Sequence, residues 1–570
     1  MPGSKVRADG SEVGTRGWVA TFAWSIAGAV LFILAFPPHA LWPLAFIAPA
    51  PTVWAAIRAT TTRQALVGVG VPQFAMNLWL VHWTIPVTVV GYPLFALYFT
   101  AYVMLAAWLL RRTDRHPRLG RLPLAVTVPL VWVGIEAIRA ALVLGGIPWF
   151  LLGHAVVEAP VLAQAADLGG TFLVSVIVAT VAGAALDVAR CRIGRSTVRR
   201  AVLVSASVVA VQASNLGYGF WRVGQTGGLT PGPTLLAIQT NLPQSNKMTS
   251  TADQKVEELR AFVMQTVDAF ERALEAGRTV DLVVWPETMV PGLGFEPDIA
   301  RAATAEGYDL ISFFPEQVLA LSDAMRTPML VGSAAYVGTR FGETIEWDRQ
   351  YNAAYLIDGA GVRARYDKVF LTPFGETMPV ISRFEWLEQR LLALGASGMR
   401  FDLSAADEVT VMSVPFGGRD LVIGTPICFE ASPSWVCRQM IYADGRKRGD
   451  LLVNLSNDGW FGDDDGARER MAQISRIRCI ENRVPMVRAV NTGLSVGIDS
   501  RGFLVDVIGP GRYGQGRAAG AVLAPVTLDA RSTLFGRTGD LVGIGLSCLA
   551  SILAILTFRT PAPTIGRRTS

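Results

Sequence analysis

The sequence predicts a bundle of membrane-spanning α-helices joined to one large α/β domain. Two observations predict this combination. The chain of 570 residues is 51% hydrophobic and only 17% charged, whereas soluble proteins carry about a quarter charged residues. The hydrophobic excess is concentrated in residues 18–217 and 540–558. The long segment between them has the composition of a soluble domain, in which short apolar strands alternate with helices.

Eight segments are candidates for membrane-spanning helices, which need about 20 predominantly apolar residues each. They run approximately over 18–36, 41–57, 64–82, 88–110, 122–143, 169–189, 200–217 and 540–558. The second is interrupted by Pro49 and Pro51 and is the weakest candidate. The first follows a charged segment, as a signal peptide would. We expect a retained helix, because no small-residue cleavage site follows it.

Basic residues are confined to alternate connections between these helices. In those connections and at both ends of the chain they number 18, whereas the opposing loops 37–40, 83–87 and 144–168 contain none. The 18 are Lys5, Arg7, Arg16, Arg58, Arg63, Arg111, Arg112, Arg115, Arg118, Arg121, Arg190, Arg192, Arg195, Arg199, Arg200, Arg559, Arg567 and Arg568. The positive-inside rule then predicts that both termini are cytoplasmic. The net charge of +5 therefore reflects topology, and nucleic acid is not an expected partner.

The predicted organisation has five parts. They are a cytoplasmic segment 1–17, a seven-helix membrane region 18–217, an extracytoplasmic domain 222–536, an eighth membrane helix 540–558 and a cytoplasmic tail 559–570. In the extracytoplasmic domain we expect strands at 234–242, 281–287, 328–337, 351–358, 361–367, 421–430, 450–458, 484–491, 494–500 and 503–509, and helices at 252–276, about 315–325, after 430 and about 466–483. Buried strands with intervening helices indicate an α/β sheet covered on both faces.

The extracytoplasmic domain contains no histidine. All four histidines, His39, His82, His116 and His154, lie in the membrane region. This excludes Ser-His and Cys-His catalytic pairs and a His-ligated metal from the domain. We expect neither a metal nor a cofactor.

Polar residues follow several of the apolar strands in this domain. Glu287 ends VVWPE, and Cys428 lies in IGTPICFE, at positions where open α/β sheets build their sites. A single cysteine of this kind is most often a buried structural residue. Glu287 and Lys368, however, end comparable apolar segments, and buried charges are rare unless they are paired. A carboxylate, an ammonium and a thiol form a coherent nucleophilic site, in which the lysine stabilises the thiolate and the carboxylate moves the proton.

Four motifs resemble, in order, those of the nitrilase or carbon–nitrogen hydrolase superfamily. They are WPE, YDKVFLTPFGE, PICFE and NLSNDGWFG, at 285–287, 366–376, 426–430 and 454–462. With its membrane helices, the whole chain resembles the apolipoprotein N-acyltransferase family. The resemblance implies an α-β-β-α sandwich and a monomeric enzyme of the bacterial plasma (inner) membrane. It also implies that a phospholipid donates an acyl chain to the amino group of the S-diacylglyceryl cysteine of an apolipoprotein.

The same resemblance implies a role for each residue that matches the family's motifs. Cys428 is the nucleophile that forms a thioester, and Glu287 is the general base in both half-reactions. Lys368 holds the oxyanion together with a backbone N–H just after Cys428, and Glu376 orients Lys368. The supporting positions are Tyr351, Asn352, Phe429 and Glu430.

Residues at a lipid gate or entrance are also expected. Met248 lies where the family's gating loop usually has an aromatic residue. Trp460 and Trp149 are aromatic candidates for the lipid entrance, although each is equally compatible with packing in the core or anchoring of a connection.

Three alternative functions are compatible with parts of the sequence. A membrane-tethered amidase that uses water as acceptor would need the same triad, but seven helices are a large anchor for a hydrolase of soluble amides. A transporter or receptor with a degenerate domain, and a scaffold that only binds lipoproteins, both predict a broken triad. Glu287, Lys368 and Cys428 are all present.

Overall fold

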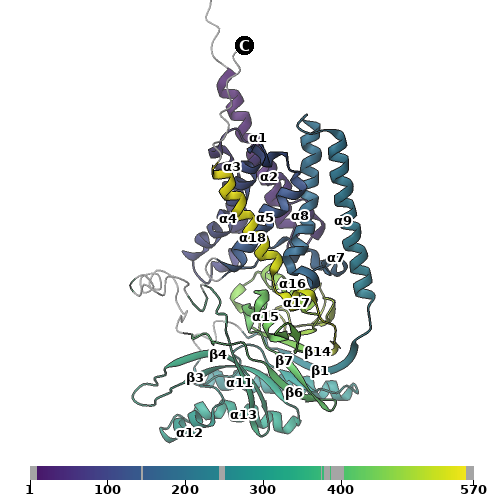
Figure 1. Ribbon diagram of the computed structural model, residues 1–570. Coiled ribbons are helices and arrows are strands. Elements are labelled where there is room, and N and C mark those ends of the chain that lie inside the picture. Colours follow the sequence, from purple (N-terminus) through teal and green to yellow (C-terminus); the bar gives the residue numbers. More distant parts are fainter. Residues whose placement is uncertain are drawn as a thin grey trace, which may run out of the picture.

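The computed structural model describes residues 9–142, 146–242, 251–373, 375–377, 386 and 403–559. It contains a helical bundle and an α/β domain, and the last helix returns from the domain to the bundle (Figure 1). The long helices of the bundle are α1 (Asp9–Ala35), α3 (Thr62–Leu80), α4 (Gly91–Arg115), α5 (Leu124–Ala141), α8 (Ala166–Arg192), α9 (Val198–Gly224) and α18 (Leu541–Arg559). Shorter elements between them are η1 (Trp42–Phe46), α2 (Pro49–Arg58), η2 (His82–Thr84), η3 (Leu119–Arg121), α6 (Leu152–Ala155), η4 (Val156–Glu158) and α7 (Pro160–Ala163).

Six helices of the described chain are long and apolar enough to cross a membrane, namely α1, α4, α5, α8, α9 and α18. The predicted count of eight is not confirmed. α3 corresponds to the third predicted span but is not among the six. The second predicted span is divided into η1 and the ten-residue α2. At 1.5 Å per residue α2 is about 15 Å long, which is half of the hydrocarbon core of about 30 Å.

The α/β domain contains two six-stranded sheets. Their strand orders are β14-β1-β2-β3-β4-β5 and β13-β12-β11-β10-β7-β6. The strands of the first sheet are β1 (Leu229–Gln239), β2 (Leu282–Val284), β3 (Met329–Val337), β4 (Arg349–Asp358), β5 (Gly361–Asp367) and β14 (Gly520–Asp529). Those of the second are β6 (Met412–Phe416), β7 (Arg419–Gly424), β10 (Leu451–Ser456), β11 (Met486–Val490), β12 (Val496–Ile498) and β13 (Leu504–Val507), and a hairpin pairs β8 (Tyr442–Ala443) with β9 (Arg446–Lys447).

Helices cover the outer face of each sheet. One hydrophobic core contains residues of both sheets, for example Leu235 and Leu330 of the first and Leu452 of the second. The first sheet packs outward against α11 (Ala252–Glu275) and α13 (Asp309–Met325), with α12 (Pro297–Ala305) beside them. The second packs against α15 (Ser434–Ile441) and α16 (Asp465–Asn482). This arrangement is an α-β-β-α sandwich, in which α11, α12 and α13 lie farthest from the bundle (Figure 1).

The central strands of both sheets run parallel. β1, β2 and β3 are parallel neighbours, as are β7, β10 and β11. Two short helical turns, η6 (Cys428–Ala431) and η7 (Asp458–Phe461), follow β7 and β10. Because parallel strands end at the same edge of a sheet, the segments that follow them are brought together there.

The contact between bundle and domain is built around α16. This helix is polar in sequence, yet nearly all its side chains are buried. Arg476 of α16 lies 3.2 Å from Glu158, and Arg483 directly after the helix lies 2.8 Å from Asp167 of α8. All four of these charged groups are less than a tenth exposed. Removing one partner of a buried pair leaves an uncompensated charge, so these pairs fix the domain on the bundle.

Candidate active site

The structure brings together the three residues of the predicted nucleophilic site from both sheets. Glu287 follows β2, Lys368 directly follows β5 and Cys428 begins η6 after β7. Lys368 is 0% exposed and Glu287 is 6% exposed, whereas Cys428 is partly exposed. Cys428 is therefore the most accessible residue of the three.

Lys368 lies between two carboxylates. Its Nζ is 2.7 Å from Oε2 of Glu376 and 3.8 Å from Oε1 of Glu287. Burial alone would lower the pKa of Lys368, but Glu376 and Glu287 outweigh it, and the pKa lies above its ordinary value. Burial raises the pKa of Glu376, but the ammonium prevails and holds this pKa below its ordinary value. Both groups are therefore charged at neutral pH.

Asn352 of β4 connects the two carboxylates. Its Nδ2 donates to Oε1 of Glu287 at 2.7 Å and to Oε1 of Glu376 at 3.0 Å. The backbone N–H of Thr372 donates to the other oxygen of Glu376 at 2.8 Å. An amide nitrogen has two hydrogens, so one side chain fixes both carboxylates around Lys368.

The Cys428 thiol is protonated in the resting site. Burial raises its pKa, Glu287 raises it further and Lys368 acts in the opposite direction, with a pKa above the ordinary value as the result. Lys368 thus acts in the direction expected from the sequence, toward the thiolate, but burial and Glu287 outweigh it. Because the thiolate is the nucleophilic form, a base must take the proton when substrate is bound. Among the nearby charges, the carboxylate of Glu287 acts most strongly on this thiol.

The backbone at Cys428 is strained. Its φ is 51°, in the left-handed region that costs a non-glycine residue free energy and occurs mainly where the surroundings impose it. Asn454 of β10 is one such constraint, since its Nδ2 donates to the carbonyl of Pro426 at 2.7 Å and to that of Cys428 at 3.4 Å. The thiol is thus presented on a turn that the neighbouring strand holds in place.

Glu430 connects the turn of Cys428 to the segment of Lys368. Its carboxylate accepts from the N–H groups of Ile427, Val369 and Phe370 at 2.8–2.9 Å and from the hydroxyl of Tyr366 at 2.9 Å. Burial raises the pKa of Glu430 to about 7, although Lys368 opposes the shift. Glu430 is fully buried, and both oxygens of its carboxylate accept these hydrogen bonds. It therefore positions the site without facing substrate.

Trp149 lies under the site in an aromatic cluster between bundle and domain. Its ring centroid is 6.1 Å from that of Phe429 and 5.8 Å from that of Phe461. Its Nε1 donates to Oγ of Ser432 at 3.2 Å. Trp149 is only 2% exposed. Its side chain is therefore packed between the bundle and the domain, whereas the sequence made it a candidate for an open lipid entrance. Phe429 is also buried in this cluster.

The other predicted residues are placed differently. Tyr351 does not join the site, because neighbouring residues of a strand point to opposite faces and Asn352 faces inward. The hydroxyl of Tyr351 accepts from Arg349 at 3.2 Å, and its ring packs in the core beside α11 and α13. Trp460 of η7 is partly buried. Met248 lies outside the described residues.

A buried ion pair near the site was not predicted. Nη2 of Arg488 in β11 lies 3.3 Å from Oδ2 of Asp458 in η7, and both side chains are buried. Nη1 of Arg488 also donates to Oγ of Ser475 in α16 at 2.9 Å. Arg488 lies in the largely apolar run VPMVRAVN. Because a charge in a buried strand needs a partner, this arginine could have indicated a buried ion pair.

Comparisons with known proteins show which family the chain belongs to. The carbon–nitrogen hydrolase model matches residues 242–551, more than half of the chain. The chain belongs to the carbon–nitrogen hydrolase family. Ahead of this match, residues 28–184 match the apolipoprotein N-acyltransferase N-terminal domain. The carbon–nitrogen hydrolase domain thus follows a membrane region that has a family model of its own.

Relatives of this carbon–nitrogen hydrolase share both regions. An apolipoprotein N-acyltransferase of Geobacter metallireducens is 29% identical, over 94% of this chain and 95% of the relative. One of Sinorhizobium fredii is 28% identical, over 97% and 99%. A solved amidase from Nesterenkonia sp. is 15% identical, covers 56% of this chain and 99% of that chain, and has a TM-score of 0.35. The two family matches and the named relatives confirm the predicted resemblance and support an acyltransferase enzyme.

Proposed function

We propose that this protein is an apolipoprotein N-acyltransferase that works through a thioester on Cys428. The donor is a membrane phospholipid, and the acceptor is the amino group of the S-diacylglyceryl cysteine at the start of an apolipoprotein. The observation that carries the proposal is a partly exposed cysteine, Cys428, beside the charged cluster of Glu287, Lys368 and Glu376, in a domain packed on apolar helices. Neither a metal nor a cofactor has a part in the scheme.

In the first half-reaction the donor ester acylates Cys428. Glu287 takes the thiol proton, and Sγ attacks the ester carbonyl carbon. The developing oxyanion is stabilised by the ammonium of Lys368 and by a backbone N–H at the start of η6, where helical N–H groups have no partner within the helix. The ester C–O bond then breaks, and the departing lysophospholipid oxygen receives the proton from Glu287. A thioester and a lysophospholipid are the products.

In the second half-reaction the acceptor amine takes the acyl chain. An α-amino group has a pKa of about 8, so part of the acceptor is neutral near that pH, its first proton having gone to the solvent. The neutral amine attacks the thioester carbon and passes its surplus proton to Glu287. The C–S bond breaks, and the thiolate takes that proton from Glu287. General acid–base help of this kind contributes about 10²–10⁴-fold to a rate.

The membrane region supports the choice of lipid substrates. Exposing an acyl chain to water costs about 0.8 kcal/mol per methylene, so a site that handles two lipidated substrates has to adjoin the bilayer. We infer that the protein lies in the bacterial plasma (inner) membrane as a monomer, with residues 222–536 outside and both termini in the cytoplasm. The distribution of 18 basic residues in the sequence supports this orientation.

The proposal is tested by supplying both substrates to the purified protein. With phospholipid and a diacylated lipopeptide, mass spectrometry should show a lipopeptide heavier by one acyl chain. Cys428→Ala is the matched inactive control. Release of free fatty acid in place of acylated lipopeptide would show that water is the acceptor, as in an amidase or esterase, and would refute the proposal.

A further inference from the structure

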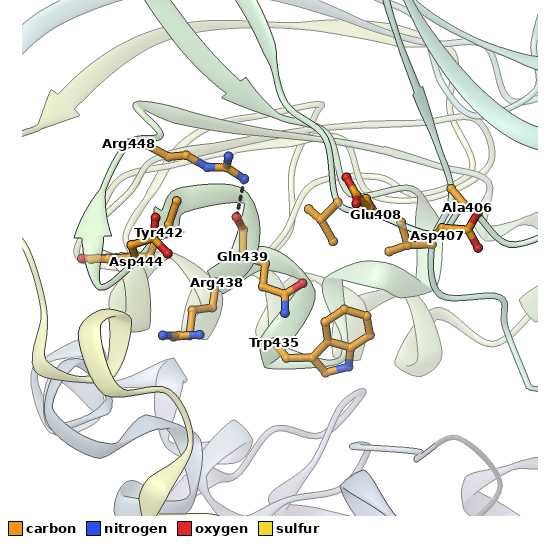
Figure 2. A pocket seen from close by; sticks show the side chains of 12 residues that line it. Ala406, Asp407, Glu408, Trp435, Arg438, Gln439, Tyr442, Asp444 and Arg448 are labelled. Carbon is orange, nitrogen blue, oxygen red and sulfur yellow. Dashed lines mark hydrogen bonds between the residues drawn. The ribbon is translucent and has the colours of Figure 1, made fainter.

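A pocket lined by described residues lies beside the active site and contains none of its triad. Its volume is about 500 Å³, within the range of about 300–1,000 Å³ that is typical of ligand sites. It lies between α15, the β8–β9 hairpin and the segment 406–409. Figure 2 shows Trp435 and Gln439 on one side of it, with Asp407 and Glu408 across from them.

The pocket shares a wall with the catalytic residues. Val369, which lines the pocket, directly follows Lys368, and its N–H donates to Glu430 in the turn of Cys428. The Trp435 ring lies edge-on to Phe370 at 6.0 Å, and Phe370 stacks on Phe429 at 6.1 Å. The rings of Phe370 and Phe429 therefore connect the pocket wall at Trp435 with the residue that follows Cys428.

The pocket also lies on the membrane side of the domain. Nε of Arg438 in its wall donates to the carbonyl of Gly536 at 2.9 Å. Gly536 belongs to α17 (Leu534–Thr538), which precedes the membrane helix α18. A molecule that has its lipid part in the bilayer and its reacting group at Cys428 can thus reach the pocket with its polar part.

The lining selects a polar ligand that carries both donors and acceptors. Trp435 is 41% exposed, and among the described residues the exposed amide of Gln439 has no hydrogen-bond partner. An acyl chain would leave this amide and the carboxylates of Asp407 and Glu408 without water or partners. A peptide backbone, by contrast, presents one N–H and one C=O per residue.

The charges disfavour the alternative of an anionic lipid headgroup. The two arginines of the lining are already used by the fold, since Arg438 donates to Gly536 and Arg448 donates to the carbonyl of Gln439 at 2.7 Å. The carboxylates of the lining, which belong to Asp407, Glu408 and Asp444, repel a phosphate. They accept hydrogen bonds from backbone N–H groups equally well whatever the peptide sequence.

We propose that this pocket binds the peptide segment that follows the acceptor cysteine. The proposal rests on the proposed function. When the amine of that cysteine is at Cys428 and its acyl chains are in the membrane, the polypeptide has to leave from the carboxyl of the same residue. The pocket receives it past Val369 and Phe370. Backbone recognition by Gln439, Asp407 and Glu408, with the flat ring of Trp435 under the side chains, suits acceptors of different sequence.

The test compares acceptors of two lengths. One is a diacylglyceryl-cysteine amide, and the other carries several residues after that cysteine. In full-length protein, Gln439→Trp fills the pocket. We expect kcat/KM for the long acceptor to fall about tenfold, a loss of about 1.4 kcal/mol, with no change for the short acceptor or for thioester formation from phospholipid alone. Glu408→Gln should act in the same direction by a smaller factor. Met264→Trp on α11, where Met264 is 68% exposed, is the matched control.

Each other outcome has a defined meaning. Equal losses for the two acceptors would overturn the proposal. Slower thioester formation in Gln439→Trp would assign the pocket to the donor headgroup and would also overturn it. If the wild-type protein acylated neither acceptor, the proposed function itself would fail, and the loss would be visible before any variant is compared.

Discussion

At the scale of the residue, the site combines a charged ammonium, that of Lys368, with a protonated thiol, that of Cys428. Lys368 is a cation held by Glu376 and Glu287, while the raised pKa of Cys428 keeps its thiol protonated. A protonated thiol is a poor nucleophile. In the proposed mechanism Glu287 therefore has to take this proton before Cys428 can attack a substrate.

Glu287→Gln should have opposite effects on two properties of Cys428. Glu287 raises the pKa of the thiol, so removing its charge lowers that pKa and increases the thiolate fraction at a given pH. The Cys428 peptide, followed by mass spectrometry, should then be alkylated faster than in the wild type at the same pH. Acylation by phospholipid should fall by about 10²–10⁴-fold, because the base is lost. Unchanged or slower alkylation would show that Glu287 does not act on this thiol.

Glu376→Gln should be milder than Glu287→Gln in single-turnover acylation. Glu376 makes the shorter contact with Lys368 and touches neither the thiol nor the predicted path of the proton. Its replacement leaves the base in place and weakens only the fixation of the ammonium. A loss as large as that of Glu287→Gln would mean that Glu376 takes part in proton transfer.

The three residues of the candidate site could be located from sequence because each lies in a recognisable motif. Glu287 follows the buried strand β2 and Cys428 follows the partly buried β7. Lys368 follows β5, which is largely polar and partly exposed, so the motif YDKVFLTPFGE identified it and apolar patterning did not. The positions of Tyr351 and Trp149 in the structure could not be predicted from the residues next to them in the sequence. Tyr351 depends on which face of β4 points inward, and Trp149 depends on how the bundle meets the domain.

At the scale of the element, apolar periodicity located most strands and helices but not every boundary. The helix expected at 252–276 corresponds to α11, and the one near 466–483 to α16. β6 and β14 were not predicted, since each mixes apolar residues with proline or polar ones. The second predicted span, which the sequence marked as interrupted by Pro49 and Pro51, is divided into η1 and α2, with Pro49 at the start of α2.

The buried pairs at α16 give a prediction about stability. Asp167→Asn removes the charge that faces Arg483 and Arg222, and breaking a buried pair in this way costs about 3–5 kcal/mol. We expect a clearly lower thermal midpoint in detergent. Glu257→Gln on α11 removes an exposed partner of Arg260 and should change stability by less than about 1 kcal/mol. Equal midpoints for the two variants would contradict the role given to Asp167.

At the scale of the whole molecule, the sandwich and the bundle form one unit joined through α16 and the Trp149 cluster. Sequence motifs placed the triad, but the pocket beside α15 could not be predicted. Its walls come from residues 369, 406–409 and 435–448, which only the fold brings together. The orientation of the unit in the membrane remains the prediction made from loop charges.

Cysteine labelling tests this orientation. In Met264→Cys, the new thiol lies on the exposed outer helix of the domain and should react with a membrane-impermeant maleimide in intact cells. Arg199→Cys, at an exposed position in the first turn of α9, should react only after the membrane is permeabilised. The reverse pattern would place the domain in the cytoplasm, away from exported lipoproteins.

The most direct measurement is the mass of the protein after incubation with phospholipid alone. The wild-type protein should gain one acyl chain on the Cys428 peptide, and hydroxylamine should remove it, as expected for a thioester. Cys428→Ala, with the other four cysteines intact, should gain none. A hydroxylamine-sensitive acyl group that persists in Cys428→Ala, or its absence from the wild type when lipopeptide is nevertheless acylated, would contradict a mechanism through Cys428.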